Sequence, residues 1–429
     1  MTDSKRQMHL AVFVVGTGNH SAGWRHDGAF DSNCSWPVLE SIAKTAERGK
    51  FDLFFVSDGL TSDADDQPSF ATRFEPTTLL GAVSMVTKKV GLGATVSTSF
   101  GEPFHVARAF ASLDHLSGGR AAWNVVTTTN EKAALNFSKQ PIPHDDRYEI
   151  AEEFVDVVRG LWGCWEEGTI VKNRETGEYI DKTRFHRLDH KGRFFSVRGP
   201  ANIQRSPQGQ PVIIHAGGSP PGQELAARVA DVVFSVVAEP DSAKRAYDEL
   251  KLRVARHGRN PDDVKILAGV MPIVGRTDAE AKAQLDRLQG WISDTTAVPL
   301  VSQRLGHDIS GYPLDGPIPE FPATERGQTF SKTLLEHARR HNMTLRDIYN
   351  LIAAAHGHWV ICGTAERIAD TLEEWFLERR ADGYIVMPPF FPGPFDDFVD
   401  LVVPELQKRG LFRKDYSGTT LLEHLGIRR

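Results

Sequence analysis

One loop of the chain combines the residue types needed to bind an anion. Residues 217–222 (GGSPPG) follow an apolar run and precede a helical pattern, and the paired glycines let the backbone approach a ligand closely. Ser219 would offer a hydroxyl and an amide at the start of that helix, where N–H groups and the helix dipole favour negative charge. The loop therefore predicts a phosphate site, although an ordinary loop with a serine N-cap has the same pattern.

A second segment, HDDRY at 144–148, stands just before the amphipathic pattern of residues 149–162. His144 has the residue type best suited to general acid–base chemistry near neutral pH. Tyr148 follows four residues later and would share its helix face. The alternative interpretation is a histidine at a helix start, balanced by Asp145 and Asp146.

Other polar residues come where apolar runs end. Asp58 follows FDLFFVS and could accept a hydrogen bond from a polar ligand, or it could cap a loop. Thr95, within a run of threonines and serines, could donate its hydroxyl to a ligand or simply fill a strand. Asn19 and His20 follow the first run, and His356 and His358 end a long segment, residues 277–358, that has no apolar strand-like run.

The histidines do not form a metal-binding pattern. His337 and His341 are spaced i, i+4, but no glutamate stands in the H-E-x-x-H position and no third ligand is evident. His356 and His358 are spaced for opposite sides of a strand or loop. We therefore predict no metal site. P-loop and G-x-S-x-G motifs are also missing from the sequence.

Eight short apolar runs alternate with longer helical patterns, which indicates an α/β protein. The runs are near-continuously apolar, as expected of parallel strands covered on both faces. They predict a (β/α)₈ TIM barrel with insertions; an open Rossmann sheet is the alternative, but no G-x-G-x-x-G follows a run. The runs cover residues 9–15, 51–57, 90–97, 120–127, 212–216, 232–237, 266–274 and 384–387.

A barrel of this kind places its active site at the carboxyl ends of its strands, where the polar residues above would meet. A minimal barrel needs about 250 residues, so well over a hundred are extra. We expect one domain over residues 1–429, with insertions at about 61–74, 166–199 and 277–358. Alternation in residues 193–197 suggests a hairpin in the second insertion, and the third could form a lid.

Composition narrows the class of protein. The 429 residues are 25% charged and 40% hydrophobic, with a formal net charge of −6, and the basic residues are scattered. These proportions are those of a globular protein, and they argue against nucleic acid as a partner. Cys34, Cys164 and Cys362 are too few and too dispersed for a disulfide framework. Without an apolar leader or a membrane-length run, we expect a cytoplasmic protein that does not engage a membrane.

Several long strings resemble the bacterial-luciferase-like superfamily. More narrowly, they resemble the FMN-dependent monooxygenases that include the nitrilotriacetate, EDTA and dibenzothiophene-sulfone monooxygenases. The similarity runs from Gln7 to Leu425. The strings that carry it include HLAVFVVGTGNHSAGWRH, ERGKFDLFFVSDGL, HDDRYEIAEEFVDVVRGLW and QPVIIHAGGSPPGQELAARVADVVFS.

The resemblance implies roles for the residues noted above. Asp58 and Thr95 would contact the isoalloxazine or ribityl part of FMN, and His144 would be the catalytic histidine beside the flavin. His144 and Tyr148 would lie at the flavin and its phosphate, and Gly218 and Ser219 would bind the phosphate. The positions that correspond to the substrate side are Asn19, His20, His356 and His358.

The resemblance also implies an activity. The protein would be a two-component monooxygenase that uses O2 and reduced FMN, through a C4a-peroxyflavin, to oxygenate a small organic substrate, with possible C–N or C–S cleavage. A separate NAD(P)H:flavin reductase would supply the reduced FMN, and the chain would form a homo-oligomer, a dimer or a tetramer. A deazaflavin-dependent hydride-transfer oxidoreductase and a non-catalytic flavin-binding protein are the alternatives.

Overall fold

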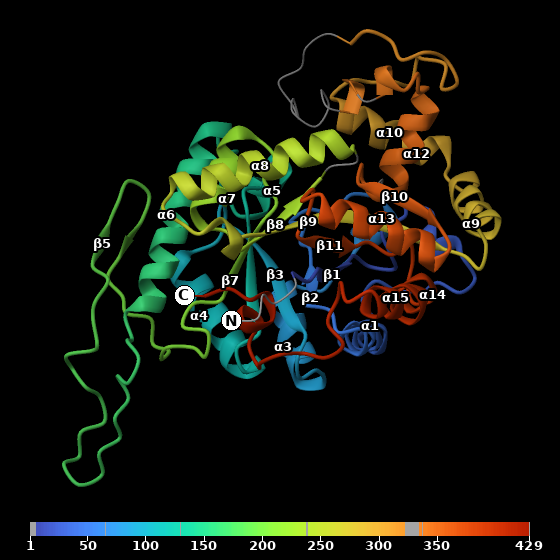
Figure 1. The fold of residues 1–429 in the computed structure, drawn as a ribbon. Coiled ribbons are helices and arrows are strands. Elements are labelled where there is room, and N and C mark those ends of the chain that lie inside the picture. The colour runs from blue at the N-terminus through green and yellow to red at the C-terminus, as the bar shows by residue number, and fades with distance from the viewer. Residues whose placement is uncertain are drawn as a thin grey trace.

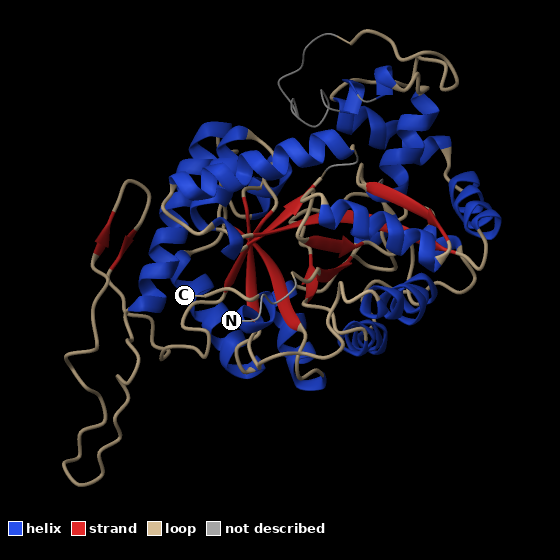
Figure 2. Cartoon of the chain, in the orientation of Figure 1, coloured by secondary structure: helices blue, strands red, loops and turns tan. Residues whose placement is uncertain are grey.

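The computed structural model describes residues 6–64, 66–128, 130–236, 239–321, 334–336 and 338–428. Eight parallel strands form a closed barrel ringed by helices (Figures 1 and 2). The predicted TIM barrel is confirmed, because β11 pairs with both β9 and β1, and β8 pairs with β9. In order round the barrel the strands are β1 (His9–Val14), β2 (Leu53–Val56), β3 (Gly91–Ser97), β4 (Ala121–Val126), β7 (Val212–His215), β8 (Val232–Ser235), β9 (Lys265–Val274) and β11 (Gly383–Val386).

Each predicted apolar run overlaps one barrel strand, and nearly every strand residue is buried. Aromatic side chains from three strands fill the interior of the barrel. The ring of Phe13 lies 5.3 Å from that of Phe55 and 5.7 Å from that of Phe234, measured between centroids. Such tilted contacts are favourable for aromatic pairs, so the barrel is a packed core and not a pore.

The outer helices bury an apolar stripe against the strands. In α6, for example, Phe154, Val157, Val158 and Leu161 are buried at the spacing of one helix face. The helices that follow barrel strands are α1 (Trp36–Arg48), α3 (Pro76–Val86), α4 (Pro103–Ser117), α6 (His144–Gly163), α7 (Pro220–Val229) and α8 (Pro240–Arg256). Helix α13 (Ala365–Leu377) precedes β11, and after β11 the chain continues as α14 (Gly393–Asp397), η3 (Phe398–Val402) and α15 (Val403–Lys408).

A ninth parallel strand, β10 (Trp359–Gly363), was not predicted from the sequence. It pairs with the second half of β9, from Val270 to Val274, and therefore lies beside the barrel and not within it. Only Ile361 and Gly363 of this strand are fully buried. The sequence lacks the continuous apolar run by which the barrel strands were found.

The remaining helices and strands lie in the loops and insertions around the barrel. Strands β5 and β6 form an antiparallel pair within residues 166–199, as the alternation near residue 195 predicted, and this segment projects far from the barrel (Figure 1). None of the described helices is long and apolar enough to cross a membrane. The bounds are η1 (Gly23–Arg25), α2 (Pro68–Ala71), α5 (Glu131–Asn136), β5 (His190–Lys191), β6 (Ser196–Val197), η2 (Pro261–Asp263), α9 (Asp278–Gly290), α10 (Asp294–Leu305), α12 (Leu345–Ala355) and α16 (Leu421–Leu425).

Candidate active site

Two hydroxyl groups meet where helices α6 and α7 begin. Tyr148 lies in the second turn of α6, Ser219 is the N-cap of α7, and their hydroxyl oxygens are 2.8 Å apart. The Ser219 oxygen also accepts a hydrogen bond from the Gly222 amide, at 3.3 Å. A Cβ atom on Gly222 would lie 3.1 Å from the Tyr148 hydroxyl, so glycine keeps this junction open. The serine therefore caps its helix and faces the tyrosine at once.

The junction has the character of an anion site. The N-terminal turns of two helices of ten or more residues lie next to it, and helix N-termini favour negative charge. A Cβ atom on Gly218 would meet no atom within 4 Å, so the loop is open on that side. The neighbouring Arg147 donates from Nη1 to the carbonyl oxygen of Thr128 at 3.2 Å, which brings a cation to the same mouth. Its Nε is buried with no hydrogen-bond partner among the described residues. The sequence analysis did not single out Arg147, although it stands inside HDDRY.

His144 is the first residue of α6, so the structure places its backbone one turn from Tyr148. Its side chain lies outside the described residues. The catalytic role of His144 therefore remains a prediction.

Thr95 and Asn124 form a polar pair on the inner wall of the barrel. The Thr95 hydroxyl donates to the carbonyl oxygen of Val56 at 2.9 Å and accepts from Asn124 Nδ2 at 2.9 Å. The Asn124 Oδ1 atom is buried and has no partner in the described part of the chain. A buried acceptor without a partner is costly, which indicates that a bound ligand donates to it. Thr95 thus orients Asn124, a residue that the sequence analysis did not assign to the site.

Asp58 lies in the loop after β2 and is half-buried. Burial raises the pKa of its carboxyl group, while the Gly59 amide, which donates to Asp58 Oδ1 at 2.8 Å, and the guanidinium of Arg73 oppose that rise. A partly desolvated carboxylate at the mouth can accept a hydrogen bond from a polar ligand edge.

Asn19 and His20 are both buried in the loop after β1. Their backbone amides donate to the carbonyl oxygens of Pro388 and Pro389, at 2.9 and 3.0 Å, so this loop is tied to the end of β11. His20 Nδ1 accepts from the Ala22 amide at 3.1 Å, which places the ring proton on Nε2. Burial lowers the pKa of His20 to about 3, so the ring is neutral. Its Nε2–H is buried without a partner within the described residues and is available to a ligand.

His358 lies over the aromatic core of the barrel. Its ring stacks on that of Phe234, with centroids 4.8 Å apart and an interplanar angle of 12°. A Cβ atom on Gly269 would come within 2.2 Å of His358 Nδ1, so the glycine makes room for the ring. His356 follows α12 with φ at 55° and meets Phe70 edge-on at 5.0 Å. Within the described ranges, no group of three or more His, Cys, Asp or Glu side chains could hold a metal ion.

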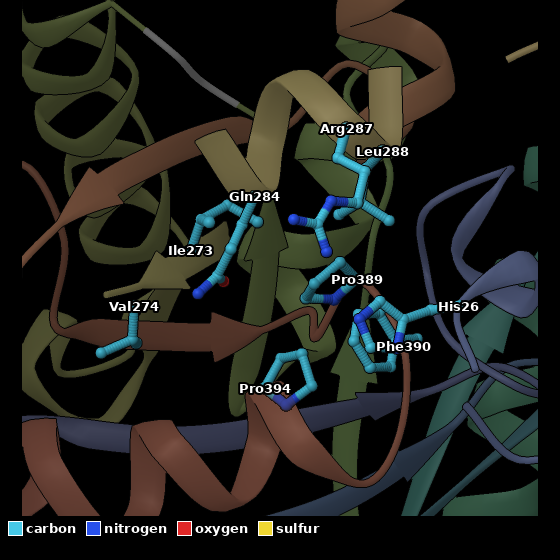
Figure 3. A pocket seen from close by; sticks show the side chains of 9 residues that line it. All are labelled: His26, Ile273, Val274, Gln284, Arg287, Leu288, Pro389, Phe390 and Pro394. Atoms are coloured by element: carbon cyan, nitrogen blue, oxygen red, sulfur yellow. The ribbon is translucent and has the colours of Figure 1, made fainter. Parts of the chain in front are cut away.

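A separate small pocket lies behind the loop after β11 (Figure 3). His26 stacks on Phe390 in its wall, with centroids 4.2 Å apart, and Arg287 and Gln284 project into it from α9. Arg287 makes no ion pair with any residue that the structure describes. Pro389 joins this pocket to the loop of His20, because its ring lines the pocket and its carbonyl accepts from the His20 amide.

Taken together, the barrel and the polar side chains at its mouth are typical of an enzyme whose active site lies at the ends of the strands. The model of the family described as luciferase-like monooxygenase matches residues 11–382, and the chain belongs to this family. It is accordingly an oxidoreductase.

Similar proteins match along almost the whole chain. The chain is 48% identical to N-acetyl-S-(2-succino)cysteine monooxygenase of Bacillus subtilis (strain 168), covering 100% of this chain and 98% of that protein. It is 40% identical to nitrilotriacetate monooxygenase component A of Aminobacter aminovorans, covering 99% and 98%. The crystal structure of EDTA monooxygenase from Chelativorans sp. BNC1 superposes with a TM-score of 0.86 at 29% identity, covering 99% of each chain. These matches confirm the resemblance inferred from the sequence.

Proposed function

We propose that this protein is the oxygenase component of a two-component monooxygenase that uses reduced FMN and O2 to oxygenate a small organic substrate. The observation that carries the proposal is the Tyr148–Ser219 contact at the start of two helices, in a chain related to monooxygenases over its full length. Those full-length relatives favour this function over a deazaflavin-dependent dehydrogenase and over a flavin-binding protein without turnover.

The residues present fit FMN. Ser219, Tyr148 and the Gly218 backbone would hold the phosphate, with Arg147 supplying positive charge. The unsatisfied Oδ1 of Asn124 indicates that a donor group belongs beside it, and the N–H edge of a flavin ring is such a donor. Thr95 and Asp58 would stand near the ring or its ribityl chain.

Reduced FMN, when bound, supplies the two electrons with which one atom of O2 enters the substrate and the other leaves as water. The protein must position the reactants, exclude bulk water and control protons. We assign proton control to His144. His20, held neutral and donating from Nε2, would hydrogen-bond the substrate without adding charge. His358 and Phe234 would keep the floor of the site apolar and dry.

The names of two relatives and the charge of one pocket support a substrate class. Relatives at 48% and 40% identity are named for N-acetyl-S-(2-succino)cysteine and nitrilotriacetate, which carry several carboxylates next to a C–S or C–N bond. We propose a carboxylate-bearing thioether or amine as the substrate here. Arg287, a guanidinium without an ion-pair partner in the part of the chain described, would attract its anionic end.

The remaining assignments follow the family. We propose that a separate NAD(P)H:flavin reductase supplies the reduced FMN, that the chain forms a homo-oligomer of one domain per chain, and that it works in the cytoplasm.

The test is a single-turnover reaction. The protein is titrated anaerobically with photoreduced FMN, mixed with oxygenated buffer and a panel of thioethers, amines, sulfones and chelators, and analysed for ¹⁸O in the product. Incorporation of one ¹⁸O per FMN oxidised is expected with at least one carboxylated substrate. Failure to bind reduced FMN, or release of hydrogen peroxide alone with every compound, would contradict the proposal.

A further inference from the structure

His215 is the last residue of β7, and its side chain lies against the loop that carries Ser219. The residue is only 3% exposed. A Cβ atom on Gly217 would come within 2.3 Å of His215 Nε2 and within 2.9 Å of the Gly222 Cα atom, so the ring and the two glycines are in close contact. The Gly222 amide in turn donates to Ser219. The imidazole is therefore part of the base of the candidate phosphate site.

One ring nitrogen of His215 is fixed as a donor. Nδ1 lies 2.8 Å from the carbonyl oxygen of Val125 in β4, and because a carbonyl can only accept, the proton of the neutral ring is on Nδ1. Nε2 then carries a lone pair, and this atom is buried without a hydrogen-bond partner among the described residues. Such an atom is costly to bury. Since Val125 holds the Nδ1 proton, Nε2 can donate only when the ring carries a second proton and a positive charge.

The surroundings of His215 favour the neutral ring as long as no anion is near. Burial lowers the pKa of His215, and backbone acceptors at Val125 and Gly222 only partly offset that effect. The neighbouring strands β4 and β8 carry no titratable side chain. Within the described ranges, no charged side chain shifts the pKa of this ring and no carboxylate pairs with it. A protonated His215 would therefore lack a counter-ion.

The two adjacent helices do not supply that counter-ion. Helix α6 brings Tyr148 and Arg147 to the loop, and neither side chain is anionic at neutral pH. The charged side chains of α7 and several acids of α6 are engaged in ion pairs with other groups. These pairs are Glu224 with Arg253 and His257, Arg228 with Asp156, Glu153 with His190, and Asp146 and Glu149 with Arg193. An anion bound at the loop would be the missing counter-ion.

We propose that His215 is a proton-linked counter-charge for the phosphate of FMN. The ring takes up one proton from solvent when the phosphate binds at Gly218 and Ser219, and Nε2 then becomes a donor beneath the anion. An opposite charge within about 4–6 Å favours the charged form of a histidine, and the effect is larger where water is excluded. The inference rests on the proposed function, because it takes the bound phosphate to be that of FMN.

Calorimetry can count this proton. The full chain is titrated anaerobically with reduced FMN at pH 7 in buffers of different ionisation enthalpy, which gives the number of protons taken up per FMN bound. The wild type is expected to take up more protons than His215→Asn, by at most about one per site. The asparagine amide can still donate to Val125 but cannot titrate. His105→Asn, at an exposed position on α4, is the matched control and should behave as the wild type does.

The affinity for FMN should depend on pH through the same group. Because the complex holds the extra proton, the affinity should fall as the pH rises from 7 to 8.5, by at most about tenfold per pH unit from this group. The phosphate itself contributes little in this range, since its second pKa is about 6. His215→Gln, which keeps a polar amide near the position of Nε2, should show a flatter dependence than the wild type.

Nitrogen NMR of the protein labelled with ¹⁵N-histidine gives a readout that a purely structural role would not change. The Nε2 resonance of His215, assigned by its loss in His215→Asn, should move from the unprotonated to the protonated range when FMN is added, and should not do so with riboflavin, which has no phosphate. The spectrum of the wild type alone is sufficient for this comparison.

The outcomes separate this inference from the proposed function. If reduced FMN binds, but proton uptake is equal in the wild type and His215→Asn or Nε2 stays unprotonated in the complex, the inference is overturned and the proposed function stands. If the wild type does not bind reduced FMN, the proposed function fails and this inference fails with it.

Discussion

The hydroxyl oxygen of Tyr148 lies 2.8 Å from that of Ser219, and this contact joins the start of α6 to the start of α7. Along the chain, the two residues are separated by the insertion at residues 166–199 and by strand β7. The contact therefore brings the N-terminal parts of two helices together, where backbone N–H groups favour negative charge. This contact is the basis for our proposal that the phosphate of FMN binds here.

Loss of both hydroxyls should weaken binding of reduced FMN. The double variant Tyr148→Phe with Ser219→Ala should lose about 1–3 kcal/mol, the scale of hydrogen bonds to a charged group. The two single variants should not be additive, because each also breaks the contact between the hydroxyls. Anaerobic calorimetry measures the affinities, with Tyr312→Phe as the matched control. Unaltered titrations of the double variant would remove the phosphate from this junction.

Replacement of His144 should separate binding from chemistry. His144→Ala should keep the affinity for reduced FMN within a few-fold of the wild type. Most of the electrons from reduced FMN should then form hydrogen peroxide instead of oxygenated product. The measurement is product formed per FMN oxidised. His105→Ala, at an exposed position on α4, is the control. If the product yield of His144→Ala matched the wild type, another group would have to manage the proton.

Acid should destabilise the fold through His20. Its pKa is about 3 in the folded protein but near 6.5 when unfolded, so below pH 6.5 the unfolded chain binds a proton that the folded chain does not. Stability should therefore fall as the pH drops from 6.5 towards 3, by at most about 1.4 kcal/mol per pH unit from this group. Urea unfolding of His20→Gln should show a shallower loss between pH 7 and pH 5.

His105→Gln serves as the control for that experiment, because the His105 ring is exposed. Burial also lowers the pKa of His215 and His424, so some acid dependence should persist in the His20 variant. An unchanged slope in His20→Gln would mean that the ring is already solvated in the folded protein.

Loss of Arg287 should affect substrate binding and not turnover. If it attracts a carboxylate, Arg287→Ala should raise the KM for di- and tricarboxylate substrates at least about tenfold, the equivalent of one charge-assisted hydrogen bond, with kcat nearly constant. Lys282→Ala is the control, since Lys282 lies on the same helix but pairs with Asp286. Equal changes in the two variants would show a general loss of surface charge and no specific role for Arg287.

The barrel strands could be predicted because both faces of each are covered, which makes them continuous apolar runs. Strand β10 was not predicted, because it lies beside the barrel and is only partly buried, so its sequence is not a continuous apolar run. Helix α6 begins at His144, five residues before the apolar pattern that predicted it, because the residues of its first turn are polar. Apolar periodicity identifies the residues of a helix that face a core, and it cannot identify a first turn made of polar residues.

Only some residues of the candidate site could be predicted from the sequence. The loop of Ser219 could be predicted, since its glycines and its position before a helix carry the signal. The unsatisfied oxygen of Asn124 could not, because an asparagine within a strand looks the same whether its amide is paired or free. The neutral state of His20 likewise depends on an amide two residues away and on complete burial.

The way the barrel closes has a consequence for biosynthesis. β11 pairs with β1 on one side and β9 on the other, although β1 lies near the start of the chain and β11 near residue 385. Until β11 has emerged from the ribosome, the nascent chain exposes two unpaired sheet edges, which are templates for aggregation. Because the barrel can close only when this late strand pairs with strands far away in the sequence, the protein should depend on chaperones while it is being made.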